Sequence, residues 1–242
     1  MLEKFVNRIV SLAAPNMEKV GAWEYSDKPL NLIQFPSPDP IITHSLTGLV
    51  EYLKGGVPLD MEMERTLIIH IKNPTIVSLY SGLNINQQRY EYVRVSHDMP
   101  QFLFGRQLTM EEFIVGLQAK FVPTADLAEV LKVVGNVRNE LITTMKDDGI
   151  SQKVTVSTSA ANVENKIVPN PVTLAPYRTF PDVNQPESQF VLRMTGGEGD
   201  TGIRCALFEA DGEQWKVEAM GNIKGWLEEQ IAGMENRPVI LA

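Results

Sequence analysis

Residues 109–158 read TMEEFIVGLQAKFVPTADLAEVLKVVGNVRNELITTMKDDGISQKVTVST, and they predict two helices followed by a strand. Thr109 and Glu112 have the spacing of a capping box, in which each side chain accepts from the other residue's backbone amide. Behind them, four apolar residues recur at helical spacing: Phe113, Ile114, Leu117 and Phe121. Pro123 is expected to end this first helix, because proline lacks an amide donor and restricts the residue before it.

The second helix is expected to begin at Thr124 as N-cap, with Asp126 in the first turn, where the helix dipole favours a carboxylate. Its apolar stripe lasts about five to six turns. The stripe contains Leu127, Val130, Leu131, Val134, Val137, Leu141 and Met145. Gly149 is expected to stop the helix. Apolar and polar residues alternate from Lys153, which predicts a strand, so the helix pair is placed at about 109–147.

The composition is typical of a soluble globular protein. The chain has 242 residues, 43% of them hydrophobic and 21% charged, which suits one large domain or two small ones. The single cysteine, Cys205, excludes an internal disulfide framework and fits a reducing cytoplasm. No stretch reaches the roughly 18 apolar residues of a membrane span. Residues 1–20 predict an amphipathic helix or arm that ends near Pro15, and they make a poor signal peptide.

The net charge of −8 disfavours nucleic acid as a partner. Proteins that bind a nucleic-acid backbone usually present a basic face, because counterion release drives that binding. Lysine and arginine are scattered along this chain, and no cluster of four or more occurs. A basic groove formed by folding stays open as an alternative.

Residues 21–104 predict a mainly-β region with one short helix. Prolines at high density in residues 16–45 favour an extended path. The helix is expected from Ser45 to Lys54, before the Gly55-Gly56 pair. Three strands are expected to form an antiparallel meander: Thr66–Ile71, Thr75–Tyr80 and Gln88–Ser96.

Residues 105–242 add further strands and a closing helix to the helix pair. The strands are expected at Gln152–Ser159, Asn165–Val168, Val172–Arg178, Gln189–Met194, Ile203–Glu209 and Gln214–Ala219. Asp211-Gly212 is typical of a two-residue hairpin turn between the last two strands. Residues 222–232 predict the C-terminal helix, and the apolar tail 239–242 predicts an added strand in this sheet or a neighbour's.

The predicted fold class is therefore α+β, with antiparallel sheets, the inserted helix pair at about 109–147 and the C-terminal helix at about 222–232. Three regions are expected: an arm at 1–20, the mainly-β region at 21–104, and the remainder at 105–242. The last two form either separate domains or one continuous domain.

No cluster has the pattern of a catalytic, cofactor or metal site. The glycines of 197–202 have dinucleotide-fingerprint spacing, but a strand follows them, and Glu198 and Asp200 repel phosphate, so a hairpin loop is expected. The three histidines are far apart in the chain: His44, His70 and His97. We expect His70 to be a half-buried strand residue and Cys205 to be a buried structural thiol. Residues 147–149 lack calcium-loop spacing and predict a turn that ends a helix.

One group of residues interleaves aromatic and basic side chains. Its members are Tyr177, Arg178, Phe180 and Arg193, with Trp215 and Lys216 farther along. When such side chains lie on a sheet, the bases of a single-stranded nucleic acid can stack on them. They also describe a sandwich core with a cationic rim, which we favour because Tyr177 and Phe180 do not share strand parity.

Four segments carry a resemblance to known sequences. They are LTMEEF at 108–113, QKVTV at 152–156, VPNPVTLAPYRTF at 168–180 and QPESQF at 185–190. With these segments the chain resembles, mainly over residues 108–232, a family of phage and prophage proteins with a domain of unknown function. The resemblance implies a phage-encoded protein in the cytoplasm of the bacterial host and brings no site residues with it.

The leading functional hypothesis is a non-enzymatic, phage-encoded homo-oligomer with a role in assembly or sequestration. It rests on the lack of a convergent reactive set and on apolar ends that can reach another subunit. The alternative is an accessory single-stranded nucleic-acid-binding protein of phage DNA metabolism, acting through Tyr177, Arg178, Phe180 and Arg193. An enzyme with an unfamiliar site, or a binder of small signalling nucleotides, also stays open.

Overall fold

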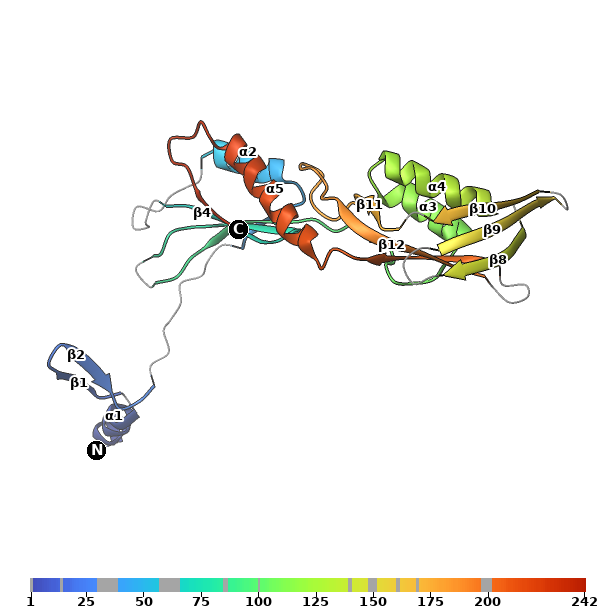
Figure 1. The fold of residues 1–242 in the computed structure, drawn as a ribbon. Helices are drawn as coiled ribbons and strands as arrows, with labels where there is room; N and C mark the ends of the chain where they lie inside the picture. Colours follow the sequence, from blue (N-terminus) through green and yellow to red (C-terminus); the bar gives the residue numbers. More distant parts are fainter. Residues whose placement is uncertain are drawn as a thin grey trace. The chain divides into compact units, whose positions relative to one another are not determined.

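The structure is a computed structural model in which the chain forms two compact units, residues 1–38 and 39–242. It describes residues 2–13, 15–29, 39–56, 66–84, 87–99, 101–138, 141–147, 152–159, 162–168, 170–196 and 202–242. The predicted α+β class is confirmed, with a helix pair and a C-terminal helix beside antiparallel and mixed sheets (Figure 1).

The first unit contains one helix and one hairpin. Helix α1 spans Leu2–Ala13, as the sequence predicts, and strands β1 (Met17–Val20) and β2 (Trp23–Ser26) pair antiparallel. Gly21 takes a φ of +67° in the two-residue turn, a conformation that glycine adopts without strain. The sequence analysis did not identify this hairpin, and its arm boundary at residue 20 falls between the two strands.

The second unit begins with a five-stranded sheet in the order β14-β4-β5-β6-β3. Its strands are β3 (Ile41–Thr43), β4 (Ile68–Asn73), β5 (Ile76–Tyr80), β6 (Glu91–Ser96) and β14 (Val239–Leu241). Helices α2 (Leu46–Lys54) and α5 (Gln214–Gln230) cover one face and share a core with it (Figure 1). The predicted meander and short helix are confirmed, and the tail pairs parallel with β4 of its own sheet.

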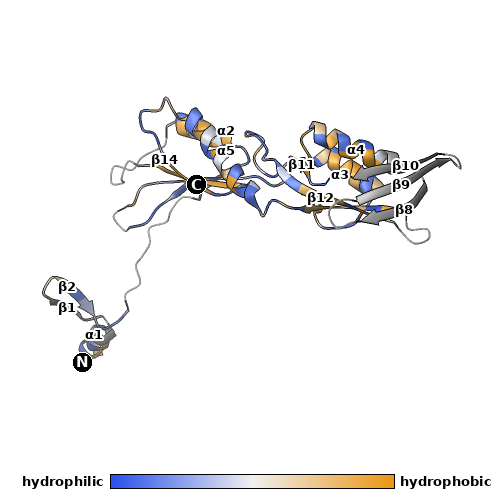
Figure 2. Cartoon of the chain, in the orientation of Figure 1, coloured by the Kyte–Doolittle hydropathy of each residue, from blue (hydrophilic) through white to orange (hydrophobic). Residues whose placement is uncertain are grey.

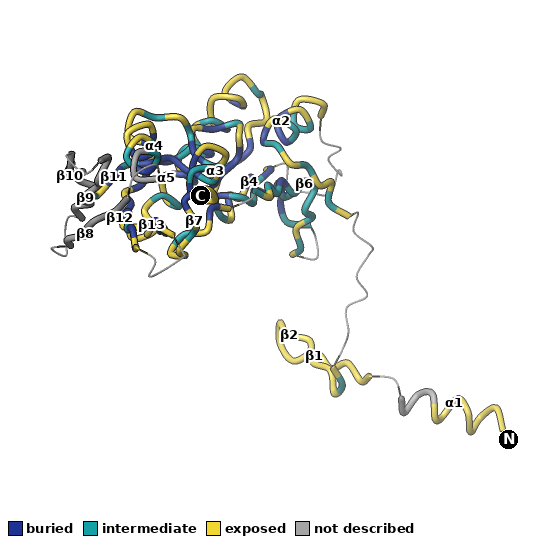
Figure 3. Tube along the Cα trace, turned by 90° about the vertical axis from the view of Figure 1, so that its right-hand side faces the viewer, coloured by how far each residue is buried: buried dark blue, intermediate teal, exposed yellow. Residues whose placement is uncertain are grey.

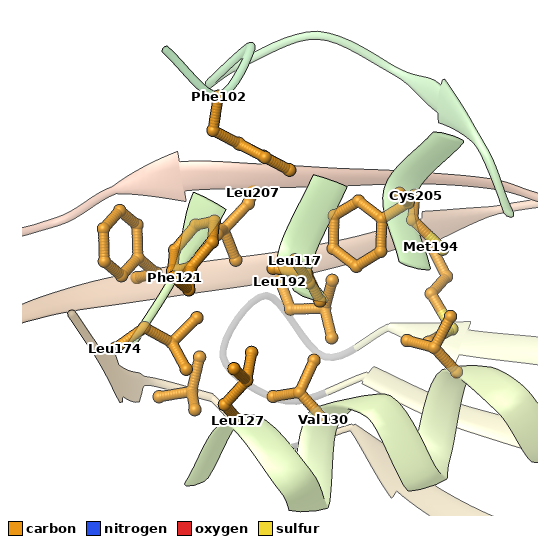
Figure 4. Packing of buried hydrophobic residues seen from close by; sticks show 14 of the residues in the cluster. Phe102, Leu117, Phe121, Leu127, Val130, Leu174, Leu192, Met194, Cys205 and Leu207 are labelled. Atoms are coloured by element: carbon orange, nitrogen blue, oxygen red, sulfur yellow. The ribbon is translucent and has the colours of Figure 1, made fainter. Parts of the chain in front are cut away.

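A four-stranded sheet in the order β11-β12-β13-β7 packs against the helix pair. Its strands are β7 (Leu108–Thr109), β11 (Val172–Leu174), β12 (Ser188–Thr195) and β13 (Arg204–Glu209). Helix α3 (Met110–Lys120) begins with both hydrogen bonds of the predicted capping box between Thr109 and Glu112. Aromatic and aliphatic side chains of α3, α4 and the sheet fill the space between them (Figure 4).

The second helix of the pair is shorter than predicted. Helix α4 spans Ala125–Arg138, and residues that continue its apolar stripe lie instead in β8 (Leu141–Asp147). Strand β8 belongs to a three-stranded sheet with β9 (Gln152–Ser159) and β10 (Asn162–Val168). The β-branched run at 142–144 favours a strand, and pairing with β9 satisfies its backbone groups. The predicted stop at Gly149 and most of the turn expected at 147–149 lie outside the described residues, and Asp147 ends a strand rather than a helix.

Three further predicted elements are corrected. Residues 214–219, predicted as a strand, form the first turns of α5, so this helix begins eight residues before the predicted 222. Asp211-Gly212 consequently makes no hairpin; the Asp211 carboxylate accepts from the amides of Glu213 and Trp215 at the start of the helix. Strand β11 ends at Leu174 rather than Arg178. Most of the glycine-rich loop (197–201) lies outside the described residues, between antiparallel strands β12 and β13.

Candidate functional site

The first unit exposes apolar side chains that its own described residues leave uncovered. Eight of the sixteen exposed large hydrophobic residues in the described part of the chain lie there: Leu2, Phe5, Val6, Ile9, Met17, Val20, Trp23 and Tyr25. Phe5 is 64% exposed and Trp23 is 73% exposed. Figure 3 shows most of the unit as exposed. Such a concentration marks an interaction surface, whereas single exposed apolar residues are ordinary.

Seven of these side chains form two apolar faces, and Met17, which pairs with Ser26, lies on the other side of the hairpin. On α1 they recur with the spacing of one helical stripe (Figure 2). On the hairpin, Val20 pairs with Trp23, and Tyr25 belongs to the same face because strand side chains alternate. We call residues 2–28 the arm. A helix of this length and a lone two-stranded hairpin are each marginally stable in water, so burial of their apolar faces would stabilise both elements of the arm.

A cavity in the second unit gathers several of the aromatic and basic residues identified from sequence. Its volume is about 460 Å³, and its lining includes Tyr177, Arg178, Trp215 and Lys216. The sequence analysis placed Trp215 in a strand, but the first turn of α5 carries it to this cavity.

Arg178 is held by fixed contacts beside the cavity. One terminal nitrogen lies 2.6 Å from Glu209 Oε1, the other donates to Ser188 Oγ, and the guanidinium carbon lies 4.2 Å from the centroid of the Trp215 ring. Burial lowers the pKa of Arg178, while the charges of Glu209 and Asp211 raise it. The guanidinium therefore ties β12, β13 and the start of α5 together, and its two terminal nitrogens are committed within the chain.

The other two residues of the predicted nucleic-acid site lie elsewhere. Phe180 is fully buried in the core beneath the five-stranded sheet, so it has no surface on which a base could stack. Arg193 lies on β12 opposite Ala206 and is half-buried. The structure thus brings together Tyr177 and Arg178, and does not join Phe180 and Arg193 to them.

A charged cluster lies on the five-stranded sheet. The Glu91 carboxylate accepts from Lys72, Ser78 and Arg94. The hydrogen bond from Arg94 is the largest influence, and against the opposing effect of burial these partners lower the pKa of Glu91 to about 2. All these contacts are internal to the sheet, which makes the cluster structural.

The histidines and the cysteine form no reactive set. His70 is exposed on β4 rather than half-buried, and His44 Nδ1 lies 2.9 Å from the Ser96 carbonyl oxygen. Among the described residues, no group of three or more histidine, cysteine or acidic side chains is placed to hold a metal ion. Cys205 is fully buried, as predicted, and burial raises the pKa of its thiol to about 12.

The chain matches no protein-family model, no curated protein and no solved structure. The resemblance of residues 108–232 to a phage protein family therefore stays a prediction. In the described part of the chain, no helix has both the length and the apolar character needed to span a membrane. The sequence indicated apolar ends, but only the structure shows that the helix and the hairpin of the arm do not bury their apolar faces against each other.

Proposed function

We propose that the protein is a non-enzymatic homo-oligomer whose copies are joined by the arm, with a role in assembly or sequestration in a bacterial host. The exposed apolar faces of α1 and the hairpin carry this proposal. Burying them removes apolar surface from water and provides the packing that a short helix and a lone hairpin lack.

The distribution of charge supports the arm as the joining segment. In residues 1–38, four lysine or arginine residues balance four aspartate or glutamate residues, so the net charge of −8 belongs to residues 39–242. Two such second units repel each other at long range. A neutral apolar segment can approach either second unit without this electrostatic repulsion.

The phage setting and the location in the host cytoplasm rest on the sequence resemblance alone. The single-stranded nucleic-acid alternative also stays a prediction. No group of described residues that the structure brings together favours nucleic-acid binding over self-assembly.

The proposal is tested by measuring the mass of the full chain with multi-angle light scattering over a range of concentrations. We expect species larger than the 27.0 kDa chain, and we expect Phe5→Asp to shift them to the monomer. Asn7→Asp is the matched control, because it adds the same charge on the polar side of α1 and should assemble normally. A wild-type monomer at every concentration overturns the proposal, as does normal assembly of Phe5→Asp.

A further inference from the structure

We propose that α1 of one copy binds in an apolar groove beside α3 of a second copy. This inference rests on the proposed function and specifies where the arm binds. The groove has a volume of about 300 Å³. Its apolar lining includes Leu103, Leu108, Val115 and Ala119, and Glu112 and Lys120 lie at its two ends. We call it the α3 groove.

Helix α3 has two apolar stripes, and only one of them is used in the core. Phe113 and Leu117 are fully buried against the four-stranded sheet. Val115 and Ala119 lie one turn apart on a different side of the helix. Val115 is 50% exposed, and Leu103 beside it is 48% exposed. The groove is therefore an apolar surface that the described part of its own unit leaves uncovered.

Gly116 brings the floor of the groove close to the helix backbone. A Cβ atom at this position would lie 2.8 Å from Cε2 of Phe102, so only glycine lets the Phe102 ring lie here without rearrangement. Phe102 itself packs edge-on against Phe113 and Phe121 in the core. The floor of the groove at Gly116 is therefore the Phe102 ring, and a second helix in the groove would pack against this ring and against Val115 and Ala119.

Helix α1 fits this groove in length and in apolar pattern. It has 12 residues and α3 has 11, which correspond to about 18 and 16 Å of helix. Leu2, Phe5 and Ile9 extend along one side of α1 and can pack between the exposed side chains of the groove.

The charges at the ends of the groove favour one orientation of α1. Glu112 lies at the start of α3 and Lys120 at its end, whereas α1 carries Glu3 in its first turn and Arg8 in its second half. Antiparallel packing places Glu3 near Lys120 and Arg8 near Glu112, so these opposite charges face each other, whereas parallel packing places them beside like charges. Lys4 lies on the side of α1 opposite its apolar stripe and so faces away from the groove.

This arrangement makes the contact heterologous. Each copy gives one arm and offers one groove, so contacts continue from copy to copy until they close as a reciprocal dimer, a ring or a shell. Pairing of two arms would always stop at a dimer. The two modes are therefore distinguished by complementation between variants.

The complementation experiment uses one variant with a disabled arm, Phe5→Asp, and one with a disabled groove, Val115→Asp. We expect each alone to be a 27.0 kDa monomer, and an equimolar mixture to give a species of about 54 kDa, because one arm and one groove remain per pair. Val217→Asp is the matched control, since Val217 is an exposed valine on α5 and its variant should assemble as wild type does. Thermal melts establish that each variant is folded.

The outcomes separate this inference from the proposed function. If Phe5→Asp is monomeric but Val115→Asp assembles normally, the groove is wrong and the arm remains the joining segment. If Phe5→Asp assembles normally, both proposals fail. A mixture that stays at 27.0 kDa also overturns the groove.

Disulfide trapping shows whether the contact joins two chains. Val6→Cys and Val115→Cys copies carrying different tags should form a mixed disulfide on oxidation, whereas Val6→Cys with Val217→Cys should not. Native Cys205 is fully buried and does not compete. A double variant, Val6→Cys with Val115→Cys, that yields only an intrachain disulfide overturns binding to a second copy.

Discussion

Arg178 shows how one buried cation connects three elements. Its guanidinium reaches Glu209 on β13 and Ser188 on β12 and stacks on Trp215 of α5. Ser188 in turn donates to Asp211, whose carboxylate accepts hydrogen bonds from the backbone amides of Glu213 and Trp215 at the start of α5. Burial raises the pKa of Asp211, but these hydrogen bonds and the charge of Arg178 more than offset it, so its pKa is lowered.

Arg178→Ala is expected to lower the free energy of unfolding by about 2–4 kcal/mol, because it removes a buried ion pair and the packing on Trp215. Arg178→Lys should recover only part of this loss, since an ammonium cannot make the forked contact. Glu209→Gln should cost less, because Glu209 is 38% exposed. Urea denaturation measures all three. Equal stability of Arg178→Ala and wild type would show that these contacts are not stabilising.

Glu91 gives the protein an acid-sensitive contact. Its pKa is lowered from 4.5 to about 2 in the folded chain. Between pH 4.5 and pH 2 this carboxylate is therefore mostly protonated in the unfolded chain and mostly ionised in the folded chain. The stabilisation is therefore complete above about pH 5 and is lost as the pH falls toward 2. Thermal melts from pH 7 to pH 2 should show a shallower acid loss for Glu91→Gln than for wild type. Glu228→Gln, on the exposed side of α5, is the control and should follow wild type.

At the scale of elements, sequence patterns correctly predicted those helices and strands that depend on interactions between neighbouring residues. The capping box at Thr109, the short helix expected from Ser45 to Lys54 and the alternation in β9 depend on neighbouring residues and were predicted correctly. Leu141 and Met145 continue the helical spacing of α4 but belong to β8, because pairing with β9 satisfies the backbone there. Trp215 and Val217 alternate as in a strand, yet they begin a helix that the core fixes through Ala219 and Ile223. The first error comes from pairing with the next strand of the chain, and the second comes from a core whose other members are distant in sequence.

The sequence predicted the candidate site less well than it predicted the fold. Tyr177 and Arg178 meet Trp215 at one cavity, but Phe180 is buried and Arg193 lies elsewhere on β12. Exposure of the apolar faces of the arm depends on how its helix and its hairpin pack, and the periodicity of the sequence does not show that packing.

Two glycines test the packing of the helix pair. Gly116→Ala should destabilise the protein by about 1–3 kcal/mol, because the new methyl group would clash with Phe102. Gly135→Ala on α4 is the matched substitution, with nothing within 4 Å of the new atom, and should stabilise by up to about 1 kcal/mol. Chemical denaturation of both variants measures the difference. The same sign for both would contradict the close approach of Phe102 to α3.

At the scale of the whole molecule, a neutral arm and an acidic second unit predict how salt affects assembly. Salt screens the repulsion between second units and leaves apolar contacts in place. The mass of the oligomer should therefore stay constant or rise between 50 and 500 mM sodium chloride. Over this range the Debye length shortens roughly threefold. Light scattering at a fixed protein concentration measures this. Dissociation at high salt would indicate an assembly held by ion pairs.

The pairing of β14 with β4 affects the order of events during synthesis. Val239 lies opposite Ile68 in the five-stranded sheet, and α5, which covers this sheet, ends at Gln230. The five-stranded sheet therefore cannot be completed until residues 239–241 have been translated, about 170 residues after Ile68. The arm is translated before any strand of this sheet. If the arm joins copies as proposed, it is available to another chain before the sheet of its own chain has closed.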